Sequence, residues 1–137
     1  MRVLPLRLEP GQDLRRALEQ ALADQGVQAA FVLSGMGSLG PAVLRLAGAE
    51  HTLRLDEELE LLTLAGSLGQ GPAGGHSHLH ASVSLPDGRV LGGHVGYGCV
   101  VRTTAEVLLA LLPDWQFTRE ADPATGWAEL VARRTAV

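Results

Sequence analysis

Residues 75–99 read GHSHLHASVSLPDGRVLGGHVGYGC and contain most of the histidines of this chain. Side chains two positions apart on a strand point to the same face, so a strand here would place His76, His78 and His80 in one row. The Pro-Asp-Gly sequence that follows predicts a turn, and a second strand after it would bring His94 beside the row. Three or four imidazoles converging on a rigid sheet predict a site for zinc or a similar divalent metal.

Length and composition limit what the rest of the chain can be. With 137 residues we expect a single domain over residues 1–137 that buries its own core. No apolar run approaches the ~20 residues of a membrane span, and the N-terminus lacks a signal-peptide pattern, so we expect a cytoplasmic protein. One cysteine excludes an internal disulfide and a thiolate-rich zinc site. A net charge of −4 argues against binding nucleic acid through its phosphates.

The segments before residue 75 predict strands around one clear helix. Asp13 is a reasonable N-cap for an amphipathic helix over residues 14–22, and Gly26 lies where a C-cap would end it. Alternating or continuous apolar patterns predict strands at residues 2–8, 27–33, 42–46, 51–55 and 59–67.

Two glycine-rich segments interrupt this pattern. Residues 34–40 match neither a dinucleotide fingerprint nor a P-loop, so we interpret them as a turn where backbones approach closely. The alternative is a small-ligand loop that offers backbone amides at Gly35 and Gly37. Residues 68–75 predict a flexible loop leading into the histidine row, so Gly74 and Gly75 are also candidates to face a ligand.

The region after Cys99 is less clear. Residues 100–112 are ambiguous, because Val and Thr favour a strand while Ala and Leu favour a helix. A further strand is expected at 115–119, then a turn and a short tail element. Strands outnumber helices without regular alternation, which favours an α+β fold with a largely antiparallel sheet.

Several segments in order resemble the signatures of a known family. They are the glycine segment followed by Leu44-Arg45, the strand at 59–67, His78-Leu79-His80 with Gly92-Gly93-His94, and the closing segments 99–106 and 122–126. Together these resemble the PPC family (plants and prokaryotes conserved), of the single-domain prokaryotic type. The resemblance covers nearly the whole chain, and the combination is more specific than any piece.

The resemblance implies properties that spacing alone does not. It implies a mixed, mainly antiparallel sheet with few helices, assembly as a homotrimer, and a zinc-like metal held by His78, His80 and His94. Plant members carry the domain behind AT-hooks that bind A·T-rich DNA, and prokaryotic members are often labelled DNA-binding by association. This sequence has no Arg-Gly-Arg-Pro hook, which together with its acidic charge disfavours DNA as a partner.

Other residues are weaker candidates. Cys99 is either a fourth ligand or a small buried hydrophobe. His76 lies outside the family signature and is expected either to support the metal ligands or to be a loop residue, and His51 is expected to be an exposed strand residue. Glu106 could act as a general base or orient a histidine if its strand lies beside the hairpin, and is otherwise a surface charge. The histidines themselves could instead form a hydrogen-bonded cluster at a subunit interface.

Three hypotheses about function follow. Three histidines without an obligatory fourth ligand leave a position open for water or substrate, as in catalytic zinc sites. The favoured hypothesis is a trimeric metal-binding domain of unknown molecular activity. The others are a metal-dependent enzyme acting on a small oxo-acid, and a DNA-associated or protein-interaction module.

Overall fold

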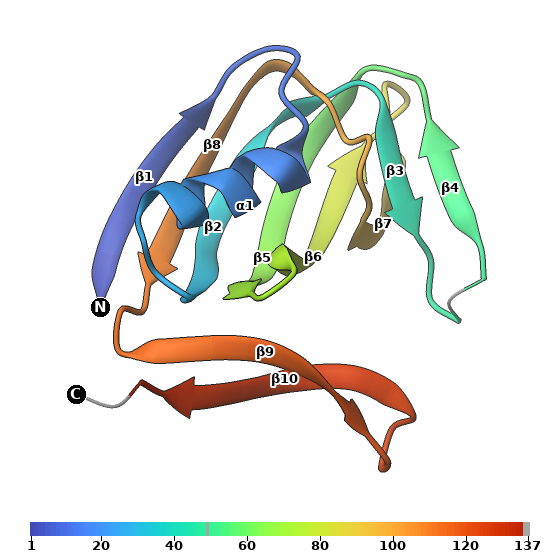
Figure 1. Cartoon of the computed structure of the whole chain (residues 1–137). Coiled ribbons are helices and arrows are strands. Elements are labelled where there is room, and N and C mark those ends of the chain that lie inside the picture. Colours follow the sequence, from blue (N-terminus) through green and yellow to red (C-terminus); the bar gives the residue numbers. More distant parts are fainter. Residues whose placement is uncertain (49, 136–137) are drawn as a thin grey trace.

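The computed structural model describes residues 1–48 and 50–135, and within them the chain forms a large and a small sheet (Figure 1). The large sheet has eight strands in the order β1-β8-β2-β5-β6-β7-β3-β4, and the small sheet pairs β10 with β9. All these neighbouring strands are antiparallel, which confirms the predicted α+β class. The elements are β1 (Arg2–Leu8), α1 (Leu14–Asp24), β2 (Ala29–Leu39), β3 (Ala42–Arg45), β4 (Thr52–Leu55), β5 (Leu59–Gly71), β6 (Gly74–Ser84), β7 (Val90–Val95), β8 (Val101–Leu111), β9 (Trp115–Asp122) and β10 (Trp127–Arg134).

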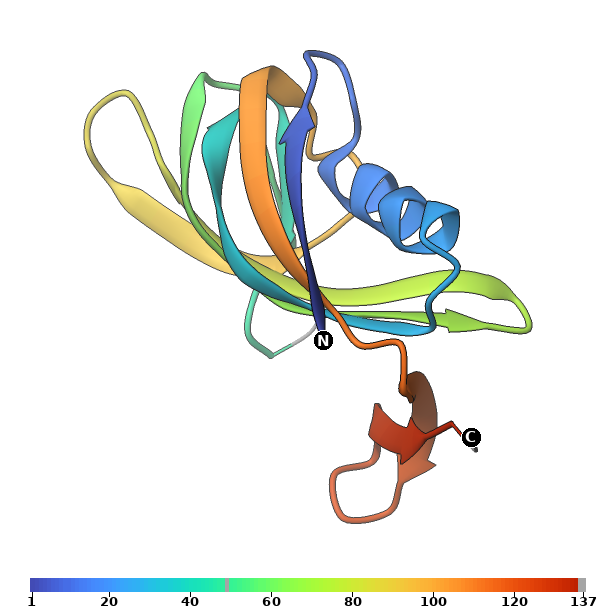
Figure 2. The same cartoon turned by 90° about the vertical axis from the view of Figure 1, so that its left-hand side faces the viewer.

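Helix α1 forms where the sequence predicts it and covers one face of the large sheet (Figure 2). The Asp13 carboxylate caps it by accepting a hydrogen bond from the Arg16 amide at 3.0 Å. The helix buries a stripe of leucines spaced four residues apart, and each contributes about 1.5–3 kcal/mol relative to an exposed position. These are Leu14, Leu18 and Leu22. No helix among the described residues is long and apolar enough to cross a membrane.

The ambiguous segment 100–112 is a strand, β8, which lies between β1 and β2. It pairs with both neighbours over most of its length, so its backbone amides and carbonyls are used on both edges. The helix propensities of Ala and Leu amount to only a few tenths of a kcal/mol per residue. The hydrogen bonds to strands on both edges therefore outweigh the helix propensity, and the segment forms a strand.

Both glycine-rich segments are strands, so the turn at 34–40 and the flexible loop at 68–75 were wrong predictions. Residues 34–39 continue β2, while residues 68–71 end β5 and Gly74 begins β6 after a tight turn. A Cβ at Gly37 would collide with the backbone of Thr104 and Ala105 on β8. The glycine run at 34–40 therefore permits close approach between strands, as the turn interpretation anticipated, but within the sheet.

The β9–β10 hairpin lies at one end of the large sheet, beside the ends of β2, β5 and β6 (Figure 1). Phe117 is buried, and its ring meets that of Phe31 edge to face with centroids 5.3 Å apart. Its amide donates to the Gln28 carbonyl at 3.2 Å. These contacts place the hairpin next to the histidine-bearing strands.

Candidate metal centre

The β6–β7 pairing brings three histidines together, as the sequence predicts. His80 lies opposite His94 in the register, and His78 is on the same face of β6 two residues earlier. His78 Nε2 lies 3.1 Å from His94 Nδ1, and His80 Nε2 lies 3.1 Å from His78 Nε2. One ring nitrogen from each histidine lies within 4.8 Å of the other two.

This donor set fits a zinc-like ion. Imidazole nitrogen is a common zinc ligand, and Zn–N bonds of about 2.0–2.1 Å in a tetrahedron separate neighbouring ligand atoms by about 3.3 Å. Two of the three nitrogen spacings, both 3.1 Å, are close to that value, and the third pair lies within 4.8 Å. Three protein ligands would leave one tetrahedral position for a further ligand.

The surroundings favour neutral imidazoles, the form that binds a metal. Burial lowers the pKa of His78 below its ordinary value of 6.5, and the positive charge of Arg119 lowers it further. Burial also lowers the pKa of His94, followed by the effect of Arg45. Both imidazoles are therefore mainly unprotonated at neutral pH.

The other two histidines are outside this cluster. His76 Nε2 is 3.0 Å from the Phe117 carbonyl oxygen, so this side chain joins β6 to the β9–β10 hairpin. Gly69, opposite His76 on β5, leaves room for its ring, because a Cβ there would overlap the imidazole. His51 is exposed and immediately precedes β4.

Cys99 does not join the histidine group among the described residues. Its thiol is buried, donates to the Val43 carbonyl at 3.3 Å, and accepts from the Val43 amide at 3.3 Å. Burial raises the pKa of the thiol, which keeps it protonated. These contacts are those of a small buried side chain.

Glu106 is separated from the histidines. The condition for its catalytic role was a strand beside the hairpin, but β2 and β5 lie between β8 and β6. Neighbouring strands are about 4.8 Å apart, so three spacings separate them. Glu106 is exposed opposite Arg7 of β1 and corresponds to the surface charge that was the alternative.

A cavity of about 670 Å³ opens beside His78 and His94. The sequence analysis did not identify most of the side chains that line this cavity, because they come from α1, β3, β9 and β10 and share no motif. The one sequence feature that pointed to a lining residue was Leu44-Arg45 in the family signature. The four glycines considered as ligand-loop residues, Gly35, Gly37, Gly74 and Gly75, do not line it. The charged and aromatic lining residues missed were Arg15, Arg45, Arg119, Trp127 and Glu129.

Curated relatives are similar to this chain over nearly all its length. The bifunctional protein GlmU of Synechococcus sp. (strain JA-3-3Ab) is 48% identical over 136 residues, which are 99% of this chain and 21% of that protein. The AT-hook motif nuclear-localized protein 14 of Arabidopsis thaliana is 30% identical over 121 residues, 87% of this chain and 28% of that protein. The chain thus spans between 21% and 28% of the length of these two relatives.

Solved structures share the fold. A hypothetical protein from Salmonella cholerae-suis has a TM-score of 0.91 at 36% identity, covering 98% of this chain and 95% of that one. A protein from Archaeoglobus fulgidus, described as metal-containing, has a TM-score of 0.83 at 29% identity, covering 96% and 94%.

The family assignment rests on a direct match as well as on these relatives. The model of the Plants and Prokaryotes Conserved (PCC) domain matches residues 1–113, which include α1 and β1 to β8. The histidines of the candidate centre lie within the matched range. The chain belongs to this family, abbreviated PCC or PPC, as its sequence signatures predict.

Proposed function

We propose that this protein is a metal-binding domain in which His78, His80 and His94 bind zinc or a similar divalent ion. The observation that carries the proposal is the meeting of three imidazole nitrogens within 4.8 Å on two paired strands. The relative from Archaeoglobus fulgidus, described as metal-containing, supports it at 29% identity. When bound, such an ion can polarise a carbonyl or lower the pKa of a bound water.

We also propose that the protein assembles as a homotrimer, as the family resemblance implies. Large apolar side chains exposed on the strands, such as Leu33, Met36 and Leu62, support an interface between copies. The alternative role of the histidines, as polar packing at a subunit interface, predicts the same assembly without metal.

Native mass spectrometry of untagged protein, purified without chelator from zinc-supplemented cells, tests both parts. We expect a trimer that carries metal, and loss of the metal in His78→Ala and His94→Ala. His51→Ala removes an exposed histidine outside the cluster and should keep the wild-type metal content. A metal-free trimer, or metal unaffected by the cluster variants, would contradict the metal-binding proposal.

Enzymatic activity is a second candidate, because a cavity adjoins the histidines. A metal-dependent enzyme acting on a small oxo-acid would lose turnover in the same two variants.

DNA binding is the third candidate, and it would be salt-sensitive and indifferent to the histidines. A titration of A·T-rich duplex at two salt concentrations distinguishes it, and the net charge of −4 predicts weak binding.

A further inference from the structure

The cavity beside the histidines has an excess of positive charge. Among the residues that the structure describes, three arginines and one carboxylate, that of Glu129, line it. The metal proposed for the neighbouring histidines would add further positive charge. A cavity of this composition is suited to an anion, because guanidinium groups present paired donors that match carboxylate and phosphate oxygens.

The three arginines differ in how far their donors are already used. Arg15 is engaged, since its guanidinium donates to Ser77 Oγ at 2.7 Å and pairs with Glu19 at 3.3 Å. Arg119 donates to Ser67 Oγ at 3.0 Å through one nitrogen only. The Arg45 guanidinium has no hydrogen-bond or ion-pair partner among residues 1–48 and 50–135. Arg45 and Arg119 therefore keep donors for a ligand, while Arg15 belongs to the wall.

Arg45 and Arg119 each lie close to one histidine of the candidate centre, as the strand register and one hydrogen bond show. Arg45 on β3 lies directly opposite His94 on β7 in the sheet register. Arg119 holds Ser67, which lies opposite His78 on the β5–β6 pair. Opposed residues in antiparallel strands have Cα atoms about 4.5–5.5 Å apart. The two guanidinium groups thus flank the histidine centre from different strands.

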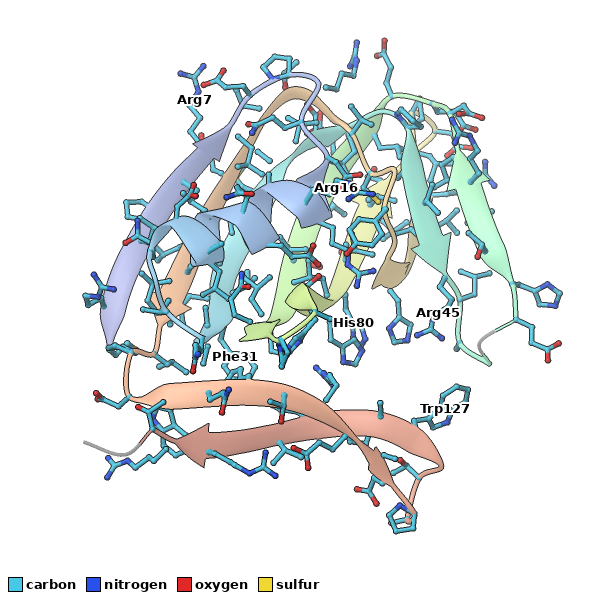
Figure 3. All side chains as sticks on the ribbon, in the orientation of Figure 1. Arg7, Arg16, Phe31, Arg45, His80 and Trp127 are labelled. Carbon is cyan, nitrogen blue, oxygen red and sulfur yellow. The ribbon has the colours of Figure 1, made fainter. Side chains whose placement is uncertain are left out.

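The β9–β10 hairpin supplies the remaining wall and an apolar surface. Trp127 at the start of β10 lines the cavity yet is 65% exposed, an unusual state for so large an aromatic ring. Figure 3 shows Trp127 on the hairpin below Arg45, with His80 nearby at the end of the large sheet. The hairpin lies outside the residues matched by the family model, 1–113. Arg119 and Trp127 are therefore contributions of this C-terminal segment.

We propose that the cavity binds a small organic anion whose carboxylate or phosphate group is held by Arg45 and Arg119 beside the histidine centre. The apolar part of the ligand lies against Trp127. This inference rests on the proposed function, because the bound metal would add positive charge next to the anionic group. The hairpin residues then determine which anion is accepted.

Isothermal titration of the purified full chain tests the proposal, with benzoate, malonate and inorganic phosphate as probes. Benzamide, which has the shape of benzoate without its charge, is the neutral control. We expect saturable binding of at least one anion and none of benzamide. Arg45→Gln and Arg119→Gln should each weaken that binding about tenfold or more, since a hydrogen bond to a charged group contributes about 1.5–3 kcal/mol.

Arg7→Gln is the matched control, because Arg7 is an exposed arginine on β1 that does not line the cavity and lies on the opposite side of Figure 3 from Arg45 and Trp127. It should leave the affinity unchanged. Phosphate binding without benzoate or malonate binding would identify the phosphate group as the anion recognised, and the converse would identify the carboxylate.

Metal content, measured on the same samples, separates the two proposals. Metal-loaded protein that binds none of the three anions, or binds them equally well in all arginine variants, overturns the anion site and leaves the metal site standing. Arginine-dependent anion binding by protein that takes up no metal supports the anion site and contradicts the proposed metal function. Arg45→Gln removes a guanidinium that has no hydrogen-bond or ion-pair partner in the described part of the chain, so loss of folding does not account for its effect.

Discussion

At the scale of single residues, the three histidines of the candidate centre converge, and two of them, His78 and His94, have a lowered pKa. His78 and His94 are half-buried and face arginines, and both effects disfavour the imidazolium form. Protons compete less with a metal for histidines that resist protonation. The arginines thus help keep these two imidazoles neutral as well as lining the cavity.

Metal retention should therefore depend on pH in a defined direction. Because burial and neighbouring arginines lower the pKa values of His78 and His94 from 6.5, protons should displace the metal only at acid pH, and the metal content should decrease as pH falls below 6.5. Dialysis at graded pH followed by elemental analysis measures this. Substantial loss of metal above pH 6.5, in buffer without chelator, would contradict it.

The lowered pKa values of His78 and His94 also determine whether the metal-free protein gains or loses stability as pH falls. Below pH 6.5 the unfolded chain, whose histidines keep their ordinary pKa, binds protons before the folded chain does. The free energy of unfolding should therefore decrease as pH falls through this range, until the lowered folded-state pKa values are passed.

The sequence was sufficient to predict the three histidines but not the rest of the cavity. His78, His80 and His94 lie in one hairpin, so the two-residue period of a strand and one turn bring them together. Arg45, Arg119 and Trp127 come from elements far apart in the chain. Their meeting depends on strand order and on the position of the hairpin, and neither follows from local patterns.

At the scale of elements, the β9–β10 hairpin is attached to the large sheet by a few specific contacts. His76 on β6 reaches the Phe117 carbonyl, and Gly69 on β5 makes space for this bond. A Cβ at Gly69 would also come within 2.7 Å of the Phe117 oxygen. Any side chain at position 69 would therefore collide with both the His76 ring and the Phe117 carbonyl oxygen.

Gly69→Ala should destabilise the protein by about 1–3 kcal/mol, the range for inserting a methyl group into a packed site. The measurement is urea denaturation followed by the fluorescence of the two tryptophans, both of which belong to the hairpin. Gly71→Ala is a matched control on the same strand, since the nearest atoms to its added Cβ would be 3.9 Å away. Equal stability of the two variants would show that the Gly69 contact has no importance for docking.

Glycine content explains why the predicted turns became strands. In most sequences a run such as residues 34–40 marks a reversal of the chain, but here the absence of side chains lets β2 lie close to β8 and β5. Bulges in β2 and β5 also break the two-residue alternation. Strand boundaries were therefore better predicted where apolar residues alternate, as in Arg2–Leu8, than where glycines interrupt them.

At the scale of the whole molecule, the large sheet has unequal faces. Helix α1 covers one face, and no other helix among the described residues covers the opposite one (Figure 2). Leucine and methionine side chains remain exposed on β2 and β5, among them Leu33, Met36 and Leu62. The sequence predicted an apolar core correctly, but a pattern of apolar residues does not separate core positions from those that another copy would cover.

If the proposed trimer uses these exposed side chains, a charge at Leu62 should dissociate it. Leu62 is 47% exposed in the single chain, so Leu62→Lys should leave the fold intact. In an interface, an unpaired ammonium group would lose its hydration at a cost of several kcal/mol. Light scattering coupled to size exclusion should show a shift from trimer to monomer.

Gln20→Lys introduces the same charge on the exposed side of α1 and should remain trimeric. A trimeric Leu62→Lys variant would place the interface elsewhere, whereas dissociation with metal retained would show that the histidine centre is complete within one chain.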